Sequence, residues 1–224
     1  MEDLFILLNK CPILEEVHAE YLNLNNLDIS FAQKAVKKRF PYFPNLIRAS
    51  ITNASFYTKH SIALIFRLSV QVLRIELDLP LSSCYRYPFY NLTCMELILK
   101  LNHCDKWLWL LELLKHCPKL QSLTINEDYW NNGKDVVDNW KDPEIVPTCI
   151  STQLRTCLLK GYKYTECGLQ FAEFIMQNSK VMKRMSIKSA SSISENVKHQ
   201  MLKKLASATR ASATLLNCCG YGLV

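Results

Sequence analysis

The chain has 224 residues, of which 49% are hydrophobic, and a formal charge of +7 at pH 7. This composition predicts a folded protein with a sizeable core and excludes a disordered chain. The start shows no secretory signal pattern, and the longest apolar runs, "SIALIFRL" and "LWLLELL", include Arg67 and Glu112 and are shorter than the ~18 residues of a membrane span. We therefore expect a cytoplasmic or nuclear protein that does not bind a membrane.

One order of segments recurs along the chain: an apolar helical run, a stop and an apolar strand. Residues 7–17, "LLNKCPILEEV", and residues 113–125, "LLKHCPKLQSLTI", both carry a Cys-Pro pair at the stop. Proline has no backbone N–H to donate, so it ends the helix and the segment after it is predicted to be extended. The ten cysteines lie mostly in such apolar patterns, and we interpret them as small buried hydrophobic residues in a reducing compartment.

Apolar residues at positions i, i+3 and i+5 predict seven strands. Their first residues are 32, 24, 22, 28, 34 and 28 positions apart, which scatters around the ~20–29 residue period of leucine-rich repeats. Helical runs at residues 4–10, 108–116 and 169–178 precede three of the strands. The pattern predicts an α/β fold, an irregular leucine-rich-repeat solenoid with a parallel sheet and helices on its convex side. The strands are marked by Leu14/Val17/Ala19, Leu46/Ala49/Ile51, Val70/Leu73/Ile75, Leu92/Met95/Leu97, Leu120/Leu123/Ile125, Leu154/Cys157/Leu159 and Met182/Met185/Ile187.

Side chains alternate across a strand, so the residues beside these buried positions face outward. If the strands stack in parallel, they line one continuous surface of mixed charge, the usual partner-binding surface of a solenoid. The same pattern would also arise from a solvated sheet face without a partner, and the sequence leaves both interpretations open. The candidate partner-binding face comprises Glu16, His18, Glu20, Arg48, Ser50, Thr52, Arg74, Glu76, Glu96, Ser122, Thr124, Asn126, Thr156, Lys160, Arg184, Ser186 and Lys188.

No catalytic, cofactor-binding or metal site is predicted. The motifs "NHC" and "KHC" place His103, Cys104, His116 and Cys117 where they could bind zinc, but there is no Cys-x-x-Cys. Cys117 also occupies the repeat position of Cys11, where a small hydrophobic residue fits. No phosphate-binding glycine loop or nucleophile motif occurs, and the chain has only five glycines. We therefore expect that the protein is not an enzyme.

After residue 126 the pattern gives way to the loop-like run "NEDYWNNGKDVVDNWKDPEIVPTC" and then resumes. A further set of residues stands at characteristic positions within 138–213: Trp140, Asp142-Pro143, Val146-Pro147, Cys149, Leu154, Gly161-Tyr162, Thr165-Glu166, Ile175, Asn178, Met182, Met185 and Ile187. This stretch resembles the FBD domain found at the C-terminus of plant F-box/leucine-rich-repeat proteins. The resemblance implies a leucine-rich-repeat region at 1–137 and a capping FBD-like α/β domain at 138–224. Trp140, Pro143 and Pro147 are interpreted as the crossing between them.

The resemblance also implies a function. In that family the repeats and the FBD domain are thought to select a target protein, while an N-terminal F-box binds the Skp adaptor of a cullin-based ubiquitin ligase. This chain opens within a repeat helix, so we expect the target-selecting part alone, with the adaptor as a partner only if an F-box stands upstream. The family's final apolar strand is also expected to be altered, because "RASAT" runs into "LLNCCGYGLV".

Two alternatives remain open at this level. The chain could be a truncated gene product without a ligase role, either inactive or a competitor for targets. It could also bind RNA through its basic residues between 180 and 204, among them Lys180, Lys183, Arg184, Lys198 and Lys203. Runs of this kind are usually solvated helix faces, so nucleic acid is the weaker expectation.

Overall fold

The computed structural model describes residues 11, 13–21, 45–53, 70–77, 88–100, 105–127, 140–163, 165–191, 193–207 and 215–219. Strands and helices follow one another in a simple order. The elements are β1 Glu16–Glu20, β2 Arg48–Thr52, β3 Val72–Leu77, β4 Cys94–Leu99, α4 Asp105–Lys115, β5 Ser122–Glu127, α5 Thr148–Thr152, β6 Thr156–Tyr162, α6 Glu166–Asn178, β7 Arg184–Ser189, α7 Glu195–Ser207 and β8 Leu215–Cys219.

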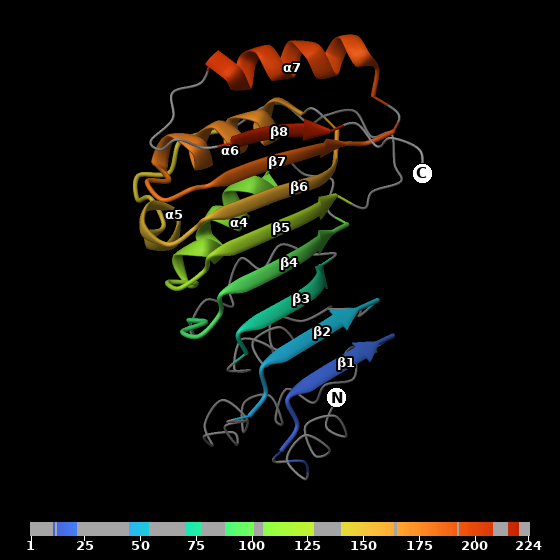
Figure 1. Ribbon diagram of the computed structural model, residues 1–224, viewed down its shortest axis with the longest axis vertical. Helices are drawn as coiled ribbons and strands as arrows, with labels where there is room; N and C mark the ends of the chain where they lie inside the picture. The colour runs from blue at the N-terminus through green and yellow to red at the C-terminus, as the bar shows by residue number, and fades with distance from the viewer. Residues whose placement is uncertain are drawn as a thin grey trace.

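The strands form one eight-stranded sheet in which every strand is parallel to its neighbours and the spatial order is the order along the chain (Figure 1). Helices α4, α5 and α6 lie on one face of this sheet, and α7 lies across its β8 end (Figure 1). The predicted α/β class with a parallel sheet is therefore confirmed. All seven predicted strand segments are strands.

Strand β8 is the last strand of the sheet. The segment "LLNCC" at residues 215–219, where the sequence predicts an altered form of the family's closing strand, forms a regular strand. It pairs with β7 over five positions, from Arg184 opposite Leu215 to Lys188 opposite Cys219. Strands β6, β7 and β8 all come from residues 138–224. Backbone pairing with β7 requires only an extended segment, so β8 can pair without a particular side-chain sequence.

The apolar positions of β2 to β7 form the core together with buried side chains of α4, α5 and α6. In the strands from β2 to β7 both inward positions are at most 4% exposed, as for Leu123 and Ile125 of β5, which are fully buried. Trp107 of α4 stacks on Phe171 of α6, with the ring centroids 4.7 Å apart. The core therefore continues from α4 into α6.

The two Cys-Pro segments make the same turn. The backbone N–H of Leu14 donates to the carbonyl of Cys11 at 3.1 Å, and that of Leu120 donates to the carbonyl of Cys117 at 3.2 Å. Cys117 is fully buried, and its thiol donates to the carbonyl of Leu113 at 3.5 Å. The interpretation of Cys117 as a small residue packed at a helix stop is confirmed, whereas Cys11 is half-buried and Pro12 lies outside the described residues.

Candidate partner-binding face

The parallel register brings the outward residues of successive strands side by side in three rows. Each row crosses β1 to β7 and takes one residue from each strand, because equivalent positions of the repeat pair with one another. The pairing of β2 with β3 ends at Ile51 opposite Ile75, and the third row continues through Thr52 and Glu76, which directly follow that pair. The first row is Glu16, Arg48, Val72, Cys94, Ser122, Thr156 and Arg184; the second is His18, Ser50, Arg74, Glu96, Thr124, Leu158 and Ser186; the third is Glu20, Thr52, Glu76, Ile98, Asn126, Lys160 and Lys188.

The third row is less accessible than the sequence suggests. Thr52 and Glu76 are only 7% and 8% exposed, and Ile98 between the polar positions is 6% exposed. Glu76 is engaged in an ion pair with Lys100. Thr52 and Glu76 therefore do not present their side chains to a partner. The other predicted face residues are exposed or half-buried.

The charges in the middle of the face compensate one another. Glu96 lies between two cations: one carboxylate oxygen is 3.9 Å from Nε of Arg74, and the other is 3.7 Å from Nζ of Lys160. At the β1 end, Nε2 of His18 is 2.9 Å from a carboxylate oxygen of Glu20. Ion pairs therefore connect β3, β4 and β6 in the middle of the face, and a side-chain hydrogen bond joins His18 to Glu20 on β1.

The β7 end of the face differs in charge. Arg184 is exposed and Lys188 is half-buried, and neither forms an ion pair with any residue in the described part of the chain. None of the row positions on β5, β6 and β7 is an aspartate or glutamate. Within the described part of the chain, the positive charge at this end is therefore not compensated by an ion pair.

The same end of the face is hollowed. An open hollow of about 410 Å³ lies over β5, β6 and β7. Within it, the hydroxyl of Thr156 donates to the hydroxyl of Ser122 at 2.9 Å. Leu158, an apolar residue of the second row that is not part of the candidate face predicted from the sequence, also lines the hollow. The lining residues are Ser122, Leu123, Thr124, Thr156, Cys157, Leu158, Arg184, Ser186 and Lys188.

The residues that the sequence suggested as possible zinc ligands do not form a cluster in the described part of the chain. His116 is half-buried, and burial lowers its imidazole pKa. Burial raises the pKa of the Cys117 thiol well above its usual range, with a smaller contribution from Cys149. His103 and Cys104 lie outside the described residues. No three His, Cys, Asp or Glu side chains among the described residues are placed to hold a metal ion.

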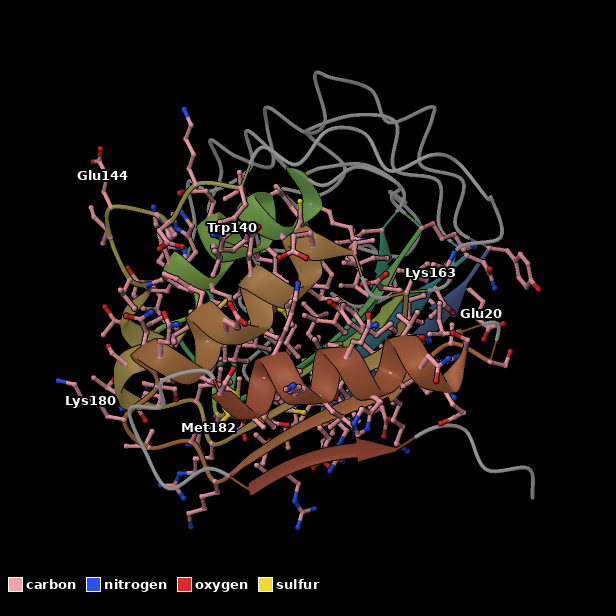
Figure 2. The ribbon with its side chains drawn as sticks, turned by 90° about the horizontal axis from the view of Figure 1, so that it is seen from above. Glu20, Trp140, Glu144, Lys163, Lys180 and Met182 are labelled. Carbon is pink, nitrogen blue, oxygen red and sulfur yellow. The ribbon has the colours of Figure 1, made fainter. Side chains whose placement is uncertain are left out.

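Trp140 is engaged within the fold. Its indole N–H donates to a carboxylate oxygen of Asp142 at 2.8 Å, and its ring meets Phe174 of α6 edge-on at 6.3 Å. Figure 2 places Trp140 on the helical side of the molecule, away from β7 and β8. Pro147 is buried and precedes α5. These contacts agree with a structural role at the crossing onto the last units of the sheet.

Most residues that carry the family resemblance are structural. Cys149, Leu154, Ile175, Met182 and Ile187 are at most 2% exposed. The hydroxyl of Thr165 caps α6 by accepting the backbone N–H of Gly168 at 3.2 Å. The family pattern therefore describes how this part folds, and the residues of the hollow are largely separate from it.

Fold and face together define an α/β protein with an uninterrupted parallel sheet, one face packed with helices and the other open. Residues 142–187 match the FBD family. Among curated proteins, an F-box/FBD/LRR-repeat protein of Arabidopsis thaliana is 32% identical over 79% of this chain and 40% of its own length. An FBD-associated F-box protein of the same plant is 28% identical over 75% of this chain and 40% of its own length.

A second F-box/FBD/LRR-repeat protein of the same plant is 26% identical over 86% of this chain and 42% of its own length. The resemblance to plant FBD and F-box proteins found in the sequence is therefore confirmed. It spans about 40% of the length of these curated relatives. No helix among the described residues is long and apolar enough to cross a membrane.

Proposed function

We propose that this chain is a non-catalytic protein-recognition module whose open sheet face binds a target protein. The observation that carries the proposal is the alignment of outward side chains in three rows across β1 to β7. We infer that the architecture is a leucine-rich-repeat solenoid over 1–137, closed by an FBD-like unit over 138–224. Such solenoids bind partners through an extended surface of this kind.

The dimensions of the face favour a protein partner. Strands about 4.8 Å apart place the first and the seventh strand about 29 Å from each other. That length suits an extended segment of eight or nine residues, or the edge of a folded domain. Every row contains polar or charged groups, and the compensated pairs around Glu96 would fix orientation more than they would add affinity.

The resemblance to F-box proteins suggests why the chain would bind a target protein. In the longer proteins an F-box would bind a Skp adaptor, and the part represented by this chain would hold the target for ubiquitin transfer in the cytoplasm or nucleus. The adaptor would then be a partner only where an F-box is joined to this chain. The target-binding step itself needs no catalytic residue.

Site-specific photo-crosslinking tests the recognition surface. A benzophenone amino acid replaces Thr124, in the second row on β5, or Gln177, which is exposed on α6 in the helical layer. In plant extract, we expect one protein to crosslink reproducibly to the Thr124 derivative and not to the Gln177 derivative. Equal crosslinking at both positions, or crosslinking at Gln177 alone, would contradict recognition through the sheet face.

Adaptor binding tests the division of labour. The 224-residue chain and the same chain fused behind a plant F-box are each titrated with purified Skp adaptor. We expect binding of the fusion only. Tight binding of the chain by itself would show that it carries an adaptor site, and the proposed restriction to target recognition would be wrong.

A further inference from the structure

We propose that the hollow over β5, β6 and β7 binds an extended acidic segment of the target protein. Two carboxylates of that segment bind Arg184 and Lys188, and an apolar side chain between them covers Leu158. This inference rests on the proposed function and specifies the chemistry of its partner. The charges, hydrogen-bond donors and spacing of the hollow each contribute to it.

The charge of the hollow favours an anionic partner. Arg184 and Lys188 both line it and have no ion-pair partner within the described residues, whereas Lys160 beside them is paired with Glu96. No row position on the three strands supplies a carboxylate. Carboxylates of a partner could therefore bind Arg184 and Lys188 without first breaking an ion pair within the described residues.

The hydroxyl groups of the hollow can also donate hydrogen bonds to acceptor atoms of a partner. Thr156 and Ser122 share one hydrogen bond, which uses only one of their two hydroxyl protons. The hydroxyls of Thr124 and Ser186 line the same hollow and make no hydrogen bond within the described part of the chain. Three hydroxyl protons are thus available beside two cations, and carboxylate and carbonyl oxygens are the complementary acceptors.

The spacing defines a pattern in the partner. Arg184 and Lys188 are four residues apart on β7, which places their α-carbons about 13 Å from each other at 3.3 Å per residue. In an extended segment, residues i and i+4 span the same length and project to the same side. Residue i+2 then lies between them, opposite Ser186 and its neighbour Leu158. The pattern is acidic-x-apolar-x-acidic.

RNA is the less suitable ligand for this surface. Proteins that bind single strands usually stack bases on aromatic rings. No row position from β1 to β7 carries Phe, Tyr or Trp. The apolar contact in the hollow is the aliphatic side chain of Leu158, which matches a peptide side chain better than a base.

Fluorescence polarisation with the full chain tests the proposal directly. The probe is a fluorescein-labelled peptide, Gly-Ser-Asp-Ser-Leu-Ser-Asp-Ser-Gly. A peptide of the same composition with the two acids adjacent, Gly-Ser-Asp-Asp-Ser-Leu-Ser-Ser-Gly, tests the spacing. We expect the first peptide to bind at least about tenfold more tightly than the second, with affinity that falls as NaCl is raised.

Matched variants locate the binding site. The double variant Arg184→Gln/Lys188→Gln removes the two cations of the hollow. The control Lys180→Gln/Lys203→Gln makes the same change in net charge. Both control lysines are exposed and neither lines the hollow. Lys180 projects from the segment between α6 and β7 (Figure 2). We expect the first pair to weaken probe binding at least about tenfold and the control less than about twofold.

Several outcomes would overturn the proposal. If both double variants lost the same affinity for the probe, only the net charge of the protein would matter. Equal affinity for the two peptides would show that the spacing of the two acidic residues does not affect binding. Oligouridylate RNA that binds more tightly than the probe and loses affinity in Arg184→Gln/Lys188→Gln would reassign the hollow to nucleic acid. Crosslinking from Thr124 does not depend on these peptides, so failure here would leave recognition by the sheet face standing.

Discussion

At the residue scale, Gly161 explains how β6 serves the face and the core at once. The ladder with β7 shifts between Lys160 and Tyr162, and Gly161 between them has a positive φ of 67°. The shift leaves Lys160 in the third row and lets Tyr162 be fully buried, with its hydroxyl donating to the carbonyl of Thr165 at 3.0 Å. A side chain with a Cβ is disfavoured at this conformation.

We expect Gly161→Ala to lower the free energy of unfolding by about 2 kcal/mol. An added Cβ would lie 2.6 Å from the carbonyl oxygen of Glu127 in addition to the cost of the left-handed conformation. Urea denaturation measures the change, with Gln177→Ala on the exposed side of α6 as a control expected within about 0.5 kcal/mol of the parent. Equal stability of the two variants would show that the backbone can relax here.

The buried cysteines have a measurable consequence at the same scale. Burial raises the thiol pKa of Cys149 and Cys157 to about 12. The thiolate is the reactive form, so these thiols stay protonated and unreactive in the folded protein at pH 8. Neither is therefore suited to nucleophilic chemistry.

Iodoacetamide at pH 8 should modify Cys94, which is half-buried on the first row, before Cys149 and Cys157. Mass spectrometry of the digested protein follows each site with time. In urea all three should react at similar rates, which serves as the control. Native labelling of Cys157 as fast as Cys94 would mean that the sheet opens readily at β6.

At the scale of elements, a buried ion pair joins α4 to β5. Nζ of Lys106 lies 3.3 Å from a carboxylate oxygen of Glu127, and the two side chains are 9% and 4% exposed. The ammonium also lies 5.1 Å from the centre of the Trp107 ring. This pair connects the start of a helix to the end of the strand that follows it.

We expect Lys106→Met to destabilise the protein by about 3 kcal/mol, because the Glu127 carboxylate would lose its buried cation. The double variant Lys106→Met/Glu127→Leu should recover most of that loss, since it removes both charges. Lys115→Met, which breaks the more exposed pair with Glu112, is a matched control expected to cost less than about 0.5 kcal/mol. Thermal unfolding of the four proteins gives the comparison, and a small loss for Lys106→Met would mean that the pair is not needed for docking α4.

At the scale of the whole molecule, one sheet runs through the proposed boundary at 137/138. Strand β5 lies before the boundary and β6 after it, and they pair over five positions. The stack of Trp107 on Phe171 crosses the boundary as well. The FBD-like part therefore depends on β5 and α4 for part of its core.

We expect residues 138–224 produced alone to lack a cooperative unfolding transition, because β6 would lose its partner strand and α6 would expose Phe171. The full chain should unfold from β5 to β7 as one unit. Circular dichroism and calorimetry of both proteins provide the test. A sharp transition of the isolated part at the melting temperature of the full chain would show that the two parts are independent.

The sequence by itself determined where strands β1 to β7 lie and which side chains they turn outward. Both follow from local rules: an apolar residue at i, i+3 and i+5 recurs in every unit, as in Leu120, Leu123 and Ile125, and alternation sets the opposite face. The sequence also showed the family resemblance. Residues such as Cys149 and Met185, which carry it, are core residues within one continuous segment of the chain. The pairing order followed from the repeat.

Only the tertiary structure decided which outward positions are accessible, where the face is hollowed and which charges remain unpaired. Glu76 and Glu96 occupy outward positions of neighbouring strands, yet one is buried beside Lys100 and the other lies between Arg74 and Lys160. Such differences depend on side chains from other repeats, which no local pattern contains. The pairing of β8 with β7 and the burial of Lys106 against Glu127 were decided in the same way, by neighbours distant along the chain.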